Sequence, residues 1–197
     1  SRKSQRTLVA PPSFGVSRVW QQHPAESENT TPCTTTMGLL KGIDPILTAD
    51  LLWVLRAMGH GDRLAIVDCN FPACQVAKST VTGKDPIILT VPLPQAVSAI
   101  CELLPLDYFE ESSVFYMAPQ DGVAMPPEGT EVIDELKSTV AKASSSDVSI
   151  APVERFQFYE EAKKCFAIVQ TLERRPYGNA ILVKGVIGPD GKDLKPN

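Results

Sequence analysis

The sequence lacks every spacing of cysteine and histidine that is typical of a metal site. Its five cysteines are scattered, odd in number and without a C-x-x-C pair, which indicates a reduced intracellular compartment rather than a disulfide framework. The two histidines, His23 and His60, lie far apart in different kinds of sequence, so we expect no metal. No stretch reaches the ~18 consecutive apolar residues of a membrane-spanning helix, so we expect no membrane partner.

Motifs for nucleotide and acyl chemistry are missing as well. The chain contains no phosphate-cradling glycine loop and no G-x-S-x-G nucleophile elbow. Its formal net charge of −4 argues against nucleic acid as the main partner. What remains is the ordinary composition of one globular domain, with 43% hydrophobic and 21% charged residues in a chain of 197.

Residues 1–36 differ from the rest of the chain. They are rich in serine, threonine and proline and have no sustained apolar period, so we expect a disordered N-terminal extension before a folded domain at 37–197. The extension has no apolar core of the kind found in secretory signals, and we expect a cytoplasmic protein. Because it contains arginine and serine but no acidic residue before Glu26, organelle targeting stays open as an alternative.

The folded part alternates between helical and strand patterns. Helices are predicted at about 48–58, 94–104, 131–142 and 156–164, and strands at about 63–68, 86–90, 114–117, 148–154, 166–169 and 180–183. Thr48 and Thr130 are the expected N-caps of the first and third helices, and Gly59 is expected to end the first in a left-handed conformation. This alternation predicts a single α/β domain with three layers, α/β/α.

Polar side chains gather in the turns beside these strands. His60 follows a helix end whose carbonyls favour a protonated imidazole, which suits a proton donor, and Asp68 follows a strand. Open α/β sheets bind ligands at the carboxyl ends of their strands. With no metal cluster nearby, such turns suit a neutral polyhydroxylated ligand or simple proton transfer. The alternative is that His60 and Asp68 are only turn residues.

Six motifs, spread in order along residues 37–187, resemble the RbsD/FucU family of monosaccharide mutarotases, and most closely its animal L-fucose branch. They are 39–43 (LLKGI), 56–62 (RAMGHGD), 68–72 (DCNFP), 103–107 (LLPLD), 154–160 (ERFQFYE) and 177–182 (YGNAIL). The resemblance implies a three-layer fold that forms a ring-like homo-oligomer, with sugar sites near the subunit contacts. It also implies interconversion of the α- and β-anomers of L-fucose without a cofactor.

The same resemblance implies roles for eight residues. It implies that His60, Asp107 and Tyr159 are catalytic, with His60 as the proton donor, and that the sugar is bound by Asp68, Met117, Arg155, Tyr177 and Asn179. Two other functions stay open. One is a ribose-type pyranase, which needs room for a furanose ring at the position that Tyr159 is expected to fill. The other is a non-catalytic sugar-binding protein, which would not need the acid and base residues His60, Asp107 and Tyr159.

Overall fold

A six-stranded mixed sheet forms the centre of the described chain. The structure is a computed structural model and describes residues 38–144 and 148–196, so the expected disorder of residues 1–36 lies outside the described residues. The strands are β1 (Arg63–Val67), β2 (Ile87–Ile88), β3 (Val114–Ala118), β4 (Ile150–Glu154), β5 (Ala167–Gln170) and β6 (Ala180–Val183). Their order in the sheet is β2-β5-β1-β6-β3-β4.

One strand of this sheet runs against the others. β6 pairs antiparallel with both β1 and β3, whereas β1 with β5, β2 with β5 and β3 with β4 are parallel pairs. The amino end of β6 therefore lies beside the carboxyl ends of β1 and β3. This orientation decides which loops meet at each end of the sheet.

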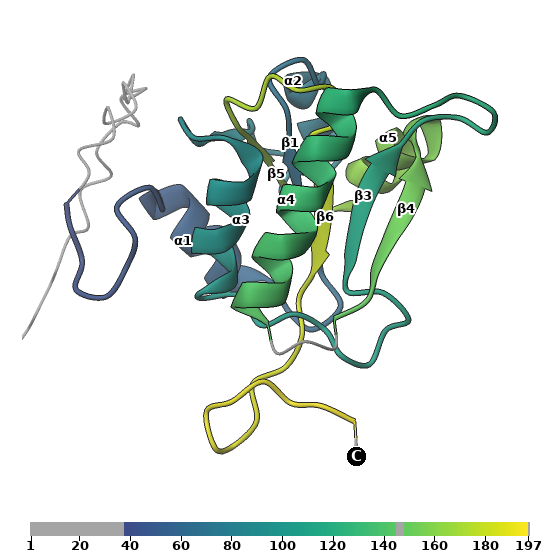
Figure 1. Cartoon of the computed structure of the whole chain (residues 1–197). Helices are drawn as coiled ribbons and strands as arrows, with labels where there is room; N and C mark the ends of the chain where they lie inside the picture. Colours follow the sequence, from purple (N-terminus) through teal and green to yellow (C-terminus); the bar gives the residue numbers. More distant parts are fainter. Residues whose placement is uncertain (1–37, 145–147, 197) are drawn as a thin grey trace, which may run out of the picture. The chain divides into compact units, whose positions relative to one another are not determined.

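Helices cover both faces of the sheet, in agreement with the predicted α/β class (Figure 1). The helices are α1 (Ala49–Ala57), α2 (Ala73–Ala77), α3 (Leu93–Cys101), α4 (Pro127–Ala143) and α5 (Arg155–Lys164). Residues of α1, α3 and α4 form one core with the sheet, and residues of α2 and α5 form a second core on the opposite face. Among the described residues, no helix is both long and apolar enough to span a bilayer.

The start of α1 agrees with the sequence, but its end does not. The Thr48 hydroxyl caps α1 by accepting a hydrogen bond from the Leu51 amide at 3.2 Å. The predicted left-handed Gly59 is wrong, because α1 ends at Ala57 with Met58 as its cap residue, and the left-handed glycine of the following turn is Gly61, at φ 80°. The side chain of Lys184, and not a glycine cap, satisfies the last carbonyls of α1.

One further local prediction is wrong and one helix was not predicted, both for identifiable reasons. α4 begins three residues before the expected cap Thr130, since Pro126 and Pro127 supply the backbone φ that a first helical turn needs. Thr130 lies inside that turn, and its hydroxyl donates to the Pro126 carbonyl at 3.3 Å. The short α2 after Pro72 was not predicted, because five residues are too few to show a helical period.

Candidate functional site

A pocket of about 270 Å³ opens at the end of the sheet where β1, β3 and β4 finish and β6 begins. Its volume lies just below the ~300–1,000 Å³ of sites for drug-sized ligands, so it suits a smaller molecule. The structure brings together here six of the residues singled out in the sequence, together with three neighbours. The lining residues are Asp68, Asn70, Phe71, Met117, Arg155, Tyr159, Pro176, Tyr177 and Asn179.

Asp68 and Asn179 form a reciprocal pair at the base of this pocket. The Asn179 side-chain amide donates to Oδ2 of Asp68 at 2.6 Å, and its carbonyl oxygen accepts from the Asp68 backbone amide at 2.9 Å. Burial raises the pKa of Asp68, although the Asn179 hydrogen bond acts in the opposite direction. The second carboxylate oxygen, Oδ1, accepts from the Asn70 amide at 2.9 Å. The pair fixes a carboxylate and an amide, which are suitable partners for sugar hydroxyls.

The apolar parts of the pocket lie on the face of the sheet that α2 and α5 cover. Met117 of β3 is buried, and its sulfur lies 3.7 Å from the Asn179 side-chain nitrogen. Tyr159 of α5 packs against Phe71, with ring centroids 5.1 Å apart and an interplanar angle of 30°. Tyr177 has a left-handed backbone, at φ 64°, which is unusual for a residue other than glycine. These side chains offer surface for the apolar face of a small ring.

Sequence reasoning missed three of the lining residues: Asn70, Phe71 and Pro176. Asn70 and Phe71 belong to a motif that was recognised, 68–72, so their place beside Asp68 was the available signal. Pro176 carried no signal of its own, because a proline in a polar turn is ordinary.

His60 and Asp107 form a second constellation elsewhere in the fold. Nε2 of His60 donates to Oδ2 of Asp107 at 2.9 Å, and the two side chains are 52% and 1% exposed. Oδ1 of Asp107 accepts from the Phe109 amide at 2.9 Å. The Phe109 ring lies edge-on to the imidazole, with centroids 6.2 Å apart. Because the Asp107 bond occupies Nε2, a proton transfer to a ligand would use Nδ1.

A close approach of two backbone segments positions Asp107. Leu106 makes an isolated bridge to Lys184, and the Asp107 amide donates to the Val183 carbonyl at 3.1 Å. A Cβ atom at Gly185 would overlap the Leu106 carbonyl, so only glycine allows this approach. Lys184 and Gly185, which directly follow β6, therefore hold the buried Asp107 carboxylate next to His60.

The expected influence of the α1 carbonyls on His60 is not what the structure shows. The Lys184 ammonium donates to the carbonyls of Leu55 and Met58, at 2.7 and 2.6 Å, and so satisfies the end of α1. Burial lowers the pKa of Lys184, and the nearby Arg56 acts in the same direction. The group that faces His60 is the Asp107 carboxylate.

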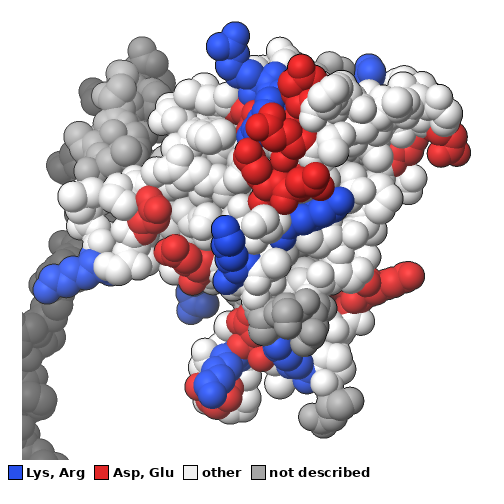
Figure 2. Space-filling model, viewed as in Figure 1, with Lys and Arg blue, Asp and Glu red and all other residues white. Residues whose placement is uncertain are grey.

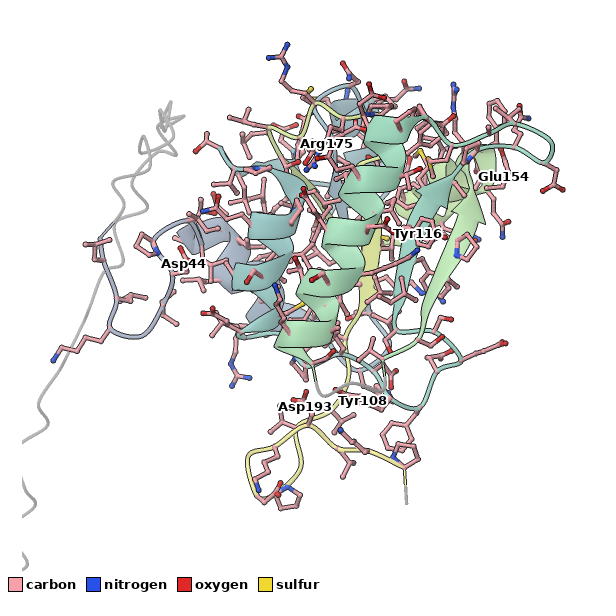
Figure 3. The ribbon with its side chains drawn as sticks, in the orientation of Figure 1. Asp44, Tyr108, Tyr116, Glu154, Arg175 and Asp193 are labelled. Carbon is pink, nitrogen blue, oxygen red and sulfur yellow. The ribbon has the colours of Figure 1, made fainter. Side chains whose placement is uncertain are left out.

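The pocket and the His60–Asp107 pair lie at opposite ends of the sheet. His60 precedes β1 and Asp68 follows it, and the five residues of β1 span roughly 16 Å. Figure 3 shows the same separation, with Glu154 and Arg175 at the upper end and Tyr108, next to Asp107, at the lower end. A single chain therefore does not bring His60 and Asp107 to the pocket that contains Tyr159. In the described part of the chain, no group of three or more His, Cys, Asp or Glu residues could hold a metal ion.

The fold and the pocket define an α/β protein with a small polar site at a sheet end, and comparison with known proteins identifies its family. The profile of the RbsD / FucU transport protein family matches residues 41–187. A fucose mutarotase of Danio rerio is 43% identical over 161 residues, which cover 78% of this chain and 98% of the relative. The chain belongs to the RbsD/FucU family.

Two solved structures share this fold. The fucose mutarotase of Streptococcus pneumoniae, in complex with L-fucose, matches with a TM-score of 0.66 and 32% identity. The match covers 76% of this chain and all of the other. The RbsD protein of Bacillus subtilis, in complex with D-ribose, matches with a TM-score of 0.57 at 20% identity, over 76% of this chain and all of the other, and shows the fold alone.

Replacing Asn179 by alanine should raise the pKa of Asp68, because a donor that stabilises the carboxylate is lost while its burial remains. Carbon-detected NMR titration of the Asp68 carboxyl measures this directly. Asn70→Ala is the matched control, since Asn70 reaches Asp68 through its backbone amide, which the substitution keeps. An equal Asp68 pKa in both variants would contradict the assignment of the Asn179 bond.

Proposed function

We propose that this protein interconverts the α- and β-anomers of L-fucose. The observation that carries the proposal is the pocket in which Asp68, Asn179 and Tyr177 offer a carboxylate, an amide and a phenol beside the apolar Met117. Such a set can hold several hydroxyl groups of one sugar in fixed orientation. The mutarotase relatives that cover nearly the whole folded part support the same reaction.

The reaction needs little chemical machinery. A proton is delivered to the ring oxygen while another is removed from the anomeric hydroxyl, and the ring opens to the aldehyde. After rotation of the aldehyde, the ring closes on its other face and both proton transfers reverse. One acid and one base suffice, each typically contributing about 10²–10⁴-fold. We assign His60 as the acid, held by Asp107, and Tyr159 as the further proton-transfer group in the pocket.

We further propose that the complete site forms between two copies of the chain. His60 and Asp107 of one protomer would face the pocket of the next, because within one chain they are separated by the length of β1. Exposed apolar side chains near the His60 end support its coverage by another copy. They are Leu103, Phe109 and Ile187. A head-to-tail contact of this kind closes into a ring when the rotation between copies allows it.

Ribose and simple binding are the alternatives. Tyr159, stacked on Phe71, occupies part of the pocket wall, which favours a hexose with an apolar methyl over a furanose. A binding protein would not need a buried carboxylate that holds an exposed imidazole, as Asp107 holds His60. Both observations favour fucose mutarotation.

Saturation-transfer NMR on L-fucose tests the function. The protein, without added metal, should accelerate exchange between the two anomeric proton signals, and D-ribose exchange should be accelerated less. If L-fucose binds but its exchange keeps the uncatalysed rate, the protein is a sugar-binding protein and not a mutarotase.

His60→Ala should lower the L-fucose exchange rate roughly 10²–10⁴-fold, because a proton donor acts in the transition state. The affinity for L-fucose, measured by calorimetry on the same sample, should change far less. A variant that keeps more than about a third of the rate, far above that range, would make His60 a turn residue or a binding group. The acid would then be sought at Asp107 or Tyr159.

Mixing two inactive variants tests the shared site. His60→Ala removes the acid and Asp68→Asn damages the pocket, so each assembly alone should be nearly inactive. When the two are dissociated, mixed in equal amounts and reassembled, about a quarter of the sites should combine an intact His60 with an intact pocket. Activity that stays at the level of the separate variants would place the whole site within one chain.

A further inference from the structure

A buried glutamate begins the turn that carries Tyr177 and Asn179. Glu173 is only 3% exposed, and both of its carboxylate oxygens accept several hydrogen bonds. Oε1 accepts from the backbone amides of Arg174 and Arg175, at 3.0 and 3.1 Å, and from Nε of Arg175 at 2.9 Å. Oε2 accepts from Nη2 of Arg175 at 2.9 Å and from the Leu93 amide at 3.3 Å. One carboxylate thus joins the turn to the first residue of α3, 80 positions away.

The backbone of the same residue joins the turn to the other half of the pocket. The Cys69 amide donates to the Glu173 carbonyl at 2.9 Å, directly beside Asp68. The Glu173 amide donates to the hydroxyl of Thr171 at 3.2 Å. Glu173 therefore contacts the segment that presents Asp68 and begins the turn that presents Asn179, the two partners of the reciprocal pair.

The side-chain stem of Glu173 also shapes the turn. A Cβ atom at Gly178 would lie 2.5 Å from Cγ of Glu173, so the chain closes against this stem at a position where only glycine fits. The preceding Tyr177 has the left-handed backbone, and the Asn179 amide donates to its carbonyl at 2.7 Å. The conformation that delivers Asn179 to Asp68 is thus built around Glu173.

Arg175 keeps this carboxylate ionised. Burial alone would raise the pKa of Glu173, but the hydrogen bonds from the Arg175 side chain and backbone outweigh it and hold the pKa below its usual value. Arg175 also donates to Glu135 of α4 at 3.0 Å, on the outer side of the guanidinium. Figure 3 places Arg175 near the start of α4, and Figure 2 shows acidic side chains gathered there with basic ones among them.

We propose that Glu173 is a positioning residue for the sugar pocket: its buried carboxylate, clamped by Arg175, holds the 173–179 turn so that Tyr177 and Asn179 face the ligand. This inference rests on the proposed function for its ligand, L-fucose, and adds a residue that does not line the pocket. Glu173 acts through Tyr177 and Asn179, which bind the sugar equally before and during ring opening. Its loss should therefore raise KM much more than it lowers kcat.

Glu173→Gln tests the proposal, with Glu135→Gln as the matched control. The amide keeps the size of Glu173 but turns an NH₂ group toward a ring of donors, so the turn must rearrange. KM for L-fucose should rise about tenfold, which corresponds to ~1.4 kcal/mol, while kcat stays within about threefold. Glu135→Gln makes the same chemical change on the outer side of Arg175 and should leave KM within about twofold, because every bond to Glu173 remains.

A second readout separates this proposal from the proposed function. The side-chain amide signals of Asn179 in the sugar-free protein should shift in Glu173→Gln and stay in place in Glu135→Gln. That comparison holds even if the unchanged protein proves unable to exchange L-fucose. A folded Glu173→Gln protein with unmoved Asn179 signals and an unchanged KM would overturn the proposal.

Should Glu173→Gln fail to fold, Arg175→Met answers the same question. It removes the two guanidinium bonds to Glu173 and keeps the backbone ones. A weaker clamp should then shift the Asn179 signals and raise KM about threefold. Unmoved Asn179 signals in Arg175→Met would mean that Glu173 serves stability alone.

Discussion

The antiparallel pairing of β6 between β1 and β3 is the constraint on which the rest of the structure depends. Its amino end begins directly after Asn179 and so delivers the amide that holds Asp68. Past its carboxyl end, Lys184 satisfies the last carbonyls of α1, and Gly185 lets the Leu106–Asp107 segment approach. One strand thereby organises both ends of the sheet at which the candidate site residues lie.

Buried carboxylates recur at the pocket, beside His60 and at the start of the 173–179 turn. Asp68 is held by Asn179, Asp107 contacts His60, and Glu173 is clamped by Arg175. A buried carboxylate without partners is costly, so each one strongly favours the single arrangement in which its donors are present. These pairs therefore select one conformation of the turns, which apolar packing alone would leave less restricted.

A mutarotase needs such geometry to bring its few reactive groups to the sugar. The exchange of anomers uses ordinary proton transfers and no covalent intermediate, so the protein has to hold the sugar hydroxyls beside an acid and a base while the ring opens. In the proposed assembly, the pocket would supply the holding groups, and the exposed imidazole at the other end of the sheet would supply the proton donor to a second copy. An enzyme divided in this way would be active only as an assembly, and its activity would depend on protomer concentration.

The sequence by itself determined the α/β class and the cap at Thr48, since periodicity and capping are local properties. Its resemblance to the RbsD/FucU family supplied six of the nine residues that line the pocket. Hydrophobic periodicity is the same for either direction of a strand, so only the tertiary structure decided that β6 runs antiparallel. That direction puts Asn179 beside Asp68 at one end of the sheet, and Lys184 and Gly185 beside the Leu106–Asp107 segment at the other. The tertiary structure also decided that Lys184 donates to the end of α1 and that Glu173 accepts from the Leu93 amide. Both bonds join residues that are distant in sequence, so no local pattern can reveal them.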